Sequence, residues 1–226
     1  MLSAVIFDFD GVITDSEILH FRSFNEVLGG YGISISKAAY YESYLGLSDF
    51  DLFTLFIEEG RLKIGREEVG GLIARKNKLF EELASSEGHI ISGVVRFVRH
   101  LREEGVPMAI CSGALLSEIE LILGDAGLRG YFETIVSADQ VKRSKPDPEG
   151  FYLVLERLGG LCGKEIKARE CVVIEDSCWG LAAAKKAGMR TVGVTNSYPA
   201  EKLSPCDMVV DGLDKLNVDV LNRLMA

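Results

Sequence analysis

Short apolar runs recur along the chain and predict buried strands. The first run covers residues 4–7, is β-branched at Val5 and Ile6, and ends at acidic residues. The runs are continuously apolar instead of alternating, which is typical of strands covered on both faces, as in a parallel sheet. The further runs cover residues 106–111, 134–136, 171–174 and 191–194.

Apolar residues at helical spacing lie between these runs. The stripes cover residues 94–101, 115–123 and 181–187, and the glycines that follow them are Gly105, Gly127 and Gly188. Glycine just after such a stripe is a common signal for the C-terminal end of a helix. The alternation of strand and helix predicts an α/β fold with a doubly wound, Rossmann-like parallel-sheet core. The glycine-rich run 159–163 is predicted to be a surface loop.

Residues 17–85 break this alternation, because they show several helical patterns and no convincing strand. We therefore predict an all-helical cap domain over 17–85 and an α/β core formed by residues 1–16 and 86–226. An insert after the first strand would lie over the carboxyl ends of the strands, where α/β proteins bind ligands. The cap is therefore expected to select the substrate.

Composition and charge narrow the range of partners. The chain has 226 residues, of which 47% are hydrophobic and 26% charged, as in an ordinary globular protein. A formal net charge of −9 argues against a nucleic-acid partner, which requires a basic face. The five cysteines form no CxxC pair, so reduced thiols are expected instead of disulfides or zinc. Because neither a signal peptide nor a membrane-length apolar run is found, we expect a cytoplasmic protein without a membrane partner.

The first predicted strand ends at two aspartates. Asp8 and Asp10 are two residues apart on an extended segment, so both carboxylates project toward one side. Such a pair repels unless a cation or a shared proton relieves it, and Mg²⁺ prefers oxygen ligands. Gly11 allows the backbone to turn close to a ligand. Taken alone, the motif is equally compatible with a solvated turn.

Polar residues also follow the next strands. Ser112 and Gly113 precede a predicted helix, where a hydroxyl and backbone N–H groups are suited to an anion, although Ser112 alone is more typical of a helix N-cap. Lys145 lies in Ser-Lys-Pro-Asp-Pro, where the prolines restrain the backbone and the ammonium is suited to a phosphate. An exposed loop lysine is the alternative.

Two acidic residues, Glu175 and Asp176, end the fourth predicted strand. They are suited to completing a metal site, whereas capping of the following helix by Asp176 or Ser177 is the alternative. The ends of parallel strands converge on one edge of a sheet. Four strand ends that supply a carboxylate pair, a hydroxyl, a lysine and a second carboxylate pair therefore indicate a single site.

These segments resemble the four motifs of the haloacid dehalogenase-like superfamily, which here read Asp8-Phe9-Asp10-Gly11, Ser112, Lys145 and Glu175-Asp176. The resemblance covers essentially the whole chain, and residues 17–85 look like the small helical cap of the family. Residues 8–15 with 20–22 are similar to the β-phosphoglucomutase and phosphoglycolate-phosphatase branch. Dehalogenating members lack the second aspartate, so Asp10 points to phosphoryl transfer.

The resemblance implies a phosphatase that acts on a small phosphorylated metabolite. Asp8 would attack phosphorus and become an aspartyl phosphate, and Asp10 would protonate the leaving oxygen and then activate water. The implied Mg²⁺ ligands are Asp8, the backbone carbonyl of Asp10 and Asp176. Glu175 is implied either as a further direct ligand or as a residue that contacts the ligands. The implied phosphate-binding groups are Ser112, the Gly113 N–H and Lys145.

The residues of the predicted cap match the family pattern less well than those of the core. A β-phosphoglucomutase carries an arginine in the cap loop that grips a second phosphate, whereas the loop here, residues 46–51, has Asp49 at that place. Leu115 likewise stands where a mutase has a nearby lysine. We therefore favour hydrolysis, with a sugar-phosphate mutase as the alternative, since His20 and Lys76 lie where cap residues would touch substrate. A non-catalytic phosphate-binding or signalling module is disfavoured, because it needs neither Asp10 nor a cap.

Overall fold

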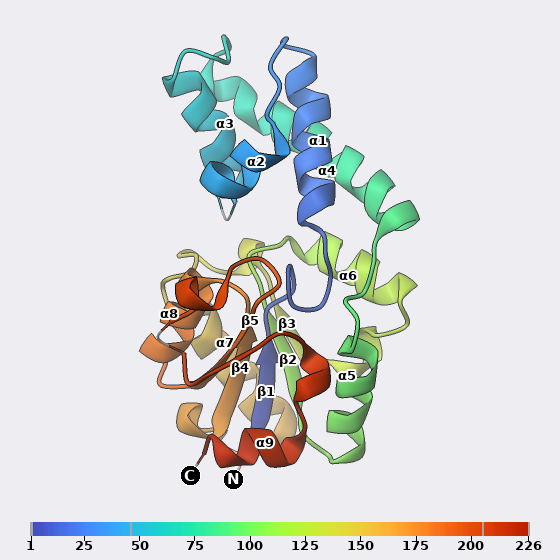
Figure 1. Cartoon of the computed structure of the whole chain (residues 1–226), viewed down its shortest axis with the longest axis vertical. Helices are drawn as coiled ribbons and strands as arrows, with labels where there is room; N and C mark the ends of the chain where they lie inside the picture. Colours follow the sequence, from blue (N-terminus) through green and yellow to red (C-terminus); the bar gives the residue numbers. More distant parts are fainter. Residues whose placement is uncertain (1, 46, 205, 226) are drawn as a thin grey trace. The chain divides into compact units, whose positions relative to one another are not determined.

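The structure, a computed structural model, describes residues 2–45, 47–204 and 206–225 (Figure 1). The chain divides into two units, Met1–Asp15 with His89–Ala226, and Ser16–Gly88. The first is an α/β unit and the second is helical. The predicted insert, residues 17–85, begins and ends slightly inside the observed helical unit.

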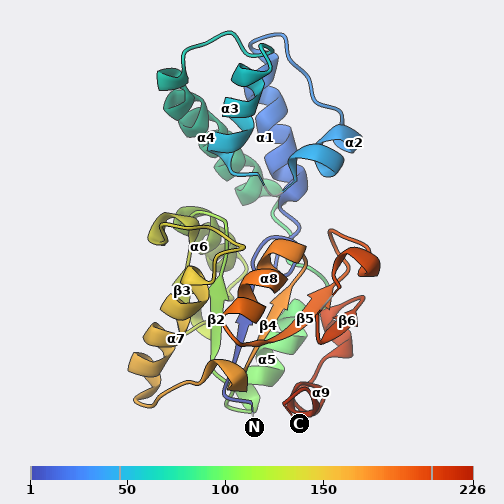
Figure 2. The same cartoon turned by 90° about the vertical axis from the view of Figure 1, so that its left-hand side faces the viewer.

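A six-stranded parallel sheet forms the centre of the α/β unit. Its strands are β1 (Ala4–Phe7), β2 (Met108–Cys111), β3 (Thr134–Val136), β4 (Cys171–Glu175), β5 (Arg190–Val194) and β6 (Met208–Val210). They are arranged in the order β3-β2-β1-β4-β5-β6, which Figure 2 shows from left to right. The chain runs outward from β1 in both directions, so the doubly wound α/β class predicted from the sequence is confirmed.

Strand β1 occupies the middle of this sheet. Ile6 pairs with Ala109 of β2 on one side and with Val173 of β4 on the other, and all four residues of β1 are buried. A strand covered on both faces and paired on both edges must be apolar throughout. That requirement explains why β1 was readable from the sequence, whereas the short, partly exposed β6 was not predicted.

Helices of the α/β unit cover both faces of the sheet. They are α5 (Val94–Glu103), α6 (Leu116–Asp125), α7 (Glu149–Cys162), α8 (Cys178–Lys186) and α9 (Val218–Arg223). The predicted helices correspond to α5, α6 and α8, and the glycines after them, Gly105, Gly127 and Gly188, have φ angles of 69°, 65° and 80°. The left-handed conformation ends each helix as expected. Side chains of α7 and α8 pack on one face of the sheet, and Phe97 of α5 packs on Phe7 from the other.

The prediction of a surface loop over residues 159–163 was wrong, because residues 159–162 form the last turn of α7. Only Gly163 leaves the helix, with a φ of 64°, and its backbone N–H donates to the Gly159 carbonyl. The apolar residues Phe151, Val154 and Leu158 hold the helix against the sheet. This packing outweighs the low helix propensity of the two glycines.

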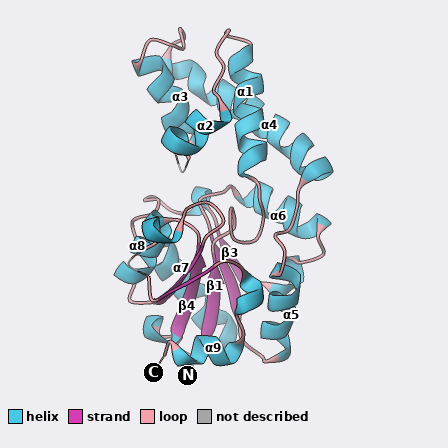
Figure 3. Cartoon of the chain, in the orientation of Figure 1, coloured by secondary structure: helices cyan, strands magenta, loops and turns pink. Residues whose placement is uncertain are grey.

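Residues 16–88 form the helical unit, and within its described part, 16–45 and 47–88, no strand is present (Figure 3). Its helices are α1 (Glu17–Gly29), α2 (Lys37–Ala39), α3 (Asp49–Glu58) and α4 (Val69–Glu87), with a π-helical turn at Tyr40–Tyr44. Their inner faces share a core that includes Phe24, Phe53 and Phe56. Among the described residues of the whole chain, no helix combines the length and apolarity needed to cross a membrane.

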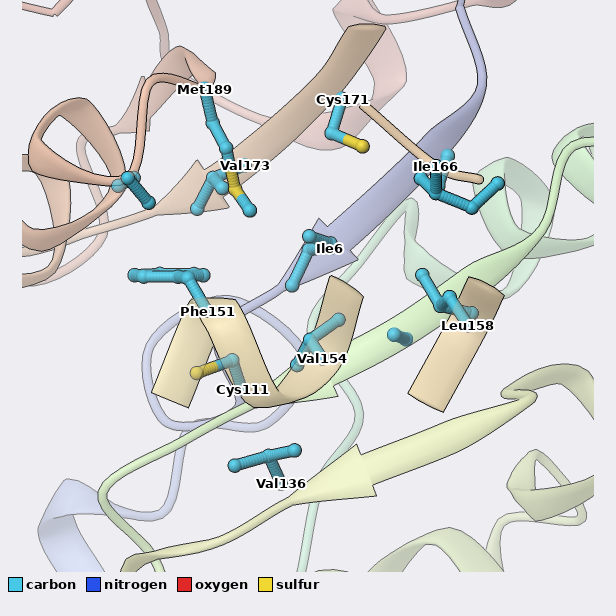
Figure 4. Close-up of a cluster of buried hydrophobic side chains, with 14 of the residues drawn as sticks. Ile6, Cys111, Val136, Phe151, Val154, Leu158, Ile166, Cys171, Val173 and Met189 are labelled. Atoms are coloured by element: carbon cyan, nitrogen blue, oxygen red, sulfur yellow. The ribbon is translucent and has the colours of Figure 1, made fainter. Parts of the chain in front are cut away.

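One core cluster joins α7 and α8 to the sheet (Figure 4). Ile6, Val173 and Val136 supply the strand side of this cluster, and Phe151 and Leu158 are among the residues that cover it from α7. Close packing of this kind makes the loss of even a few methyl groups measurable. Its members Ile6, Cys111 and Val173 precede the polar residues Asp8, Ser112 and Glu175 by one or two positions.

Replacement of Leu158 by alanine should lower the free energy of unfolding by about 2–5 kcal/mol, since the side chain is fully buried and would leave a cavity. Urea unfolding followed by circular dichroism measures the change. Leu161→Ala on the same helix is the matched control, because Leu161 is 62% exposed. Equal destabilisation by the two variants would contradict the assignment of residues 158–162 to one amphipathic helix.

Candidate active site

The ammonium of Lys145 lies at the centre of the site. Its Nζ donates to Asp8 Oδ1 at 2.8 Å, to Glu175 Oε1 at 2.6 Å and to the Cys111 carbonyl at 2.9 Å. An ammonium has three N–H donors, so these contacts use all of them. The side chain of Lys145 is only 16% exposed, which excludes the alternative of a solvated loop lysine.

Asp8 is the first residue after β1, and its backbone N–H donates to the Ile174 carbonyl at 2.9 Å. This bond continues the β1–β4 pairing and directs the carboxylate to the carboxyl edge of the sheet. Burial, together with the neighbouring Glu175 charge, raises the pKa of Asp8 to about 7, although Lys145 opposes the rise. The carboxylate of Asp8 is therefore held where its negative charge is costly without a further cation.

Glu175 is the last residue of β4 and Asp176 follows it, and both are buried. The second oxygen of Glu175, Oε2, accepts from the Ser177 N–H and hydroxyl, both at 2.8 Å. Ser177 is also the N-cap of α8, with its hydroxyl accepting from Gly180 N–H. The capping role therefore belongs to Ser177, and the Asp176 carboxylate instead points to the site.

Asp8, Glu175 and Asp176 each place a carboxylate oxygen within 4.8 Å of the others. Among the ion pairs described for these three acids, the ammonium is that of Lys145, which pairs with Asp8 and Glu175, so this described group has excess negative charge. All the donors are carboxylate oxygens, the chemistry that a hard divalent cation prefers. A Cβ added at Gly11 would also overlap the Asp176 carboxylate, so only glycine lets the backbone at position 11 lie this close to Asp176. The residues present therefore fit a divalent metal ion.

Asp10 lies in the turn that follows β1 and forms an isolated bridge with Thr14. Its charge adds to the elevation of the Asp8 pKa, which places the two side chains in one electrostatic environment. Gly11 follows with a φ of 73°, and its N–H donates to the Thr14 carbonyl at 2.8 Å. Asp10 is therefore near enough to Asp8 to influence its ionisation.

Ser112 continues β2, since its N–H donates to the Val136 carbonyl at 2.9 Å. The expectation that Ser112 stands at a helix N-terminus was wrong. Helix α6 begins at Leu116, and the Ser112 hydroxyl accepts from Ala114 N–H within the intervening loop. Gly113 in that loop is exposed, and an added Cβ there would contact nothing within 4 Å, so a ligand can approach its backbone.

Two site residues were missed by the sequence interpretation, Asn196 and Ser197, in the loop after β5. The Asn196 side-chain amide donates to the Gly11 carbonyl at 2.7 Å, and the Ser197 hydroxyl donates to Asp176 Oδ2. Both follow a predicted strand, so the strand-end reasoning used for the other four strands could have found them. Their small polar side chains made the signal weak.

Inside the helical unit, His20 and Lys76 contact each other. Lys76 Nζ lies 2.8 Å from His20 Nδ1 and 3.1 Å from Asp49 Oδ2, and its side chain is 1% exposed. The rings of Phe24 and Phe80 lie 5.2 Å from the ammonium. Burial, and then the Lys76 charge, holds the pKa of His20 well below its usual range, so the imidazole is neutral and accepts at Nδ1. Of the predicted loop 46–51, Gly46 lies outside the described residues, and the prediction was wrong for residues 49–51, which form the first turn of α3.

The parallel sheet and the acidic cluster at its carboxyl edge define an α/β protein with a site suited to a hard cation. Comparison with known proteins takes this further. Residues 5–194 match the family described as haloacid dehalogenase-like hydrolase. The chain therefore belongs to the haloacid dehalogenase-like hydrolase family, as the four motifs predicted.

Several curated relatives of the chain are named phosphatases. A fructose-1-phosphate phosphatase from Escherichia coli is 32% identical over 85% of this chain and 96% of its own length. A phosphorylated carbohydrates phosphatase from Thermotoga maritima is 31% identical over 87% of each chain. A solved β-phosphoglucomutase from Clostridium difficile has a TM-score of 0.84 and 26% identity, covering 100% of this chain and 97% of that one. The prediction of an enzyme of the haloacid dehalogenase-like phosphatase class agrees with these findings.

Replacement of Lys145 by methionine should lower the free energy of unfolding by about 3–5 kcal/mol, because two buried carboxylates lose their common cation. Urea unfolding in EDTA measures the change. Lys215→Met removes an exposed lysine paired with Asp214 and serves as the control, for which no measurable change is expected. An unaltered unfolding midpoint in Lys145→Met would contradict a central role for this ammonium.

Proposed function

We propose that the chain is a Mg²⁺-dependent phosphatase that hydrolyses a small phosphorylated carbohydrate through an aspartyl phosphate on Asp8. The observation that carries this proposal is the setting of Asp8. It lies at the end of the central strand, bonded to Lys145 and within 4.8 Å of two further buried acids. The carbohydrate class follows from the curated relatives named above.

In this proposal Asp8 attacks phosphorus with one carboxylate oxygen, and the bond from phosphorus to the leaving oxygen breaks. Asp10 donates a proton to that leaving oxygen. The resulting Asp10 carboxylate then removes a proton from the water that attacks the aspartyl phosphate, which releases phosphate and restores Asp8. Asp10 suits this role because it shares the turn with Asp8 and is only partly buried.

The metal would be held by Asp8, Asp176 and the Asp10 backbone carbonyl. When bound, Mg²⁺ supplies positive charge that offsets the charge of the transferring phosphoryl group. Both oxygens of Glu175 already accept hydrogen bonds, so Glu175 is not proposed as a direct ligand. It would instead hold Lys145, which in turn bonds the ligand Asp8. Ser112, the Gly113 N–H and Lys145 are the proposed phosphoryl-oxygen ligands. For Lys145 this requires that an incoming oxygen replace one of its three present acceptors.

The helical unit is proposed to contact the remainder of the substrate, with His20 and Lys76 as candidate contacts. Lys76 carries the positive charge of this pair, and Asp49 neutralises it at 3.1 Å. A mutase must hold a second phosphate during turnover, and a buried phosphate dianion requires paired cations. A lysine already paired with a carboxylate offers little net charge for that purpose, so hydrolysis is favoured over the mutase alternative.

Asp8→Asn should abolish phosphate release while the protein stays folded, because an amide cannot form the acyl phosphate. Phosphate release is measured over a panel of sugar and sugar-alcohol phosphates, with Mg²⁺ and with EDTA. Asp125→Asn, at the exposed end of α6, is the control and should keep wild-type activity. Wild-type turnover by a folded Asp8→Asn protein, or full wild-type activity in EDTA, would overturn the mechanism.

With β-glucose 1-phosphate and a trace of glucose 1,6-bisphosphate, the enzyme should release free phosphate at least as fast as it forms glucose 6-phosphate. The reason is the neutralised Lys76, which holds a bisphosphate poorly. Both products are followed in the same reaction. Rapid formation of glucose 6-phosphate with little free phosphate would instead identify the mutase.

A further inference from the structure

The loop after β5 reaches two different parts of the candidate active site. Ser197 donates its hydroxyl proton to Asp176 Oδ2, and Asn196 donates from Nδ2 to the Gly11 carbonyl at 2.7 Å. Asp176 follows β4 and Gly11 follows β1, so three strand ends meet here. The bond between Asn196 and Gly11 spans 185 positions of sequence.

These groups are packed too closely for the contacts to be incidental. A Cβ built on Gly11 would overlap the Asp176 carboxylate and would lie 2.7 Å from Ser197 Oγ. The Gly11 backbone, the carboxylate and the hydroxyl therefore occupy one small volume. Because Asp176 is only 5% exposed, bulk water cannot set the orientation of its carboxylate.

We propose that Ser197 is a positioning residue for the divalent cation, in that its hydroxyl fixes the rotation of the Asp176 carboxylate. This inference rests on the metal requirement of the proposed function. A hydroxyl bound to Oδ2 determines where Oδ1 points. Mg²⁺ demands near-octahedral ligand geometry, so the direction of that oxygen decides how well it binds the ion.

The neutrality of serine matters as much as its position. A lysine or arginine at this place would cancel the carboxylate charge that attracts the cation, as Lys145 already does for Asp8. A hydroxyl orients the carboxylate and leaves its charge in place. Partners of this kind behind metal-binding carboxylates typically change metal affinity by 10–100-fold when removed.

Asn196 contacts the backbone of the same glycine, Gly11. Its amide holds the Gly11 carbonyl, and the backbone of Gly11 is directly joined to Asp10. Gly11 has a φ of 73°, a conformation that side-chain-bearing residues rarely adopt. The amide therefore helps to hold the turn that carries the Asp10 carbonyl, the backbone ligand proposed for the metal.

The test measures Mg²⁺ binding without substrate, so its outcome is separate from that of the phosphatase assay. The chain has one tryptophan, Trp179, which lies half-exposed in the first turn of α8, close in sequence to Asp176. Its fluorescence during Mg²⁺ titration reports binding, and the Mg²⁺-induced rise in Tm provides a second measurement. Ser197→Ala, Ser197→Thr and Ser117→Ala are compared, the last being an exposed serine of α6.

Ser197→Ala should require about 10–100-fold more Mg²⁺ than the wild type for half-saturation. Ser197→Thr should bind nearly as the wild type does, because it keeps the hydroxyl, and Ser117→Ala should be unchanged. In EDTA the Tm of Ser197→Ala should stay close to that of the wild type, and saturating Mg²⁺ should restore most of kcat. A solely structural role would instead lower the Tm equally with and without Mg²⁺.

Two results would overturn the inference. Wild-type Mg²⁺ affinity in Ser197→Ala, in a protein whose wild type does bind Mg²⁺, would refute the positioning role and leave the proposed phosphatase intact. The absence of Mg²⁺ binding to the wild type in both measurements would refute the positioning role together with the metal requirement. The phosphate-release assay with EDTA distinguishes these two cases.

Discussion

Within the α/β unit, the ammonium of Lys145 joins three segments that are far apart in sequence, the ends of β1, β2 and β4. Asp8 and Glu175 could not both remain charged beside each other in a buried site without it, because desolvation and mutual repulsion act in the same direction. Among the described contacts, the Lys145 ammonium faces three carboxylates, so Asp8, Glu175, Asp176 and Lys145 together carry a net negative charge. This net negative charge lies at the carboxyl edge of the sheet and makes the site suitable for a divalent cation.

The charge of a second lysine, the buried Lys76 in the helical unit, is neutralised differently. Its described partners include one carboxylate, Asp49, and a neutral imidazole, that of His20. The pair of lysine and carboxylate has no net charge, whereas the group around Lys145 keeps an excess of negative charge. Under the proposed function this contrast separates two tasks. One site would bind a cation and a phosphoryl group, and the other would contact the remainder of the substrate.

Much of the fold was readable because its signals are local. Strand β1 is apolar throughout since both of its faces and both of its edges are covered, and the helices before Gly105, Gly127 and Gly188 end where a left-handed residue is needed. The last turn of α7 was misread, because packing of Leu158 on the sheet outweighs the propensity of the glycines. Strand β6 is short and half-exposed, and its pattern differs little from that of a loop.

The sequence by itself determined which chemical groups end the strands, and therefore that Asp8, Lys145, Glu175 and Asp176 would converge, since parallel strands share one carboxyl edge. It did not determine which donor meets which acceptor. The partners of Lys145, the contact of Ser197 with Asp176 and the neutralisation of Lys76 by Asp49 depend on strand order, register and helix packing. Hydrogen bonds reach only about 3 Å, so they are decided by the tertiary structure, which alone brings distant residues to that distance.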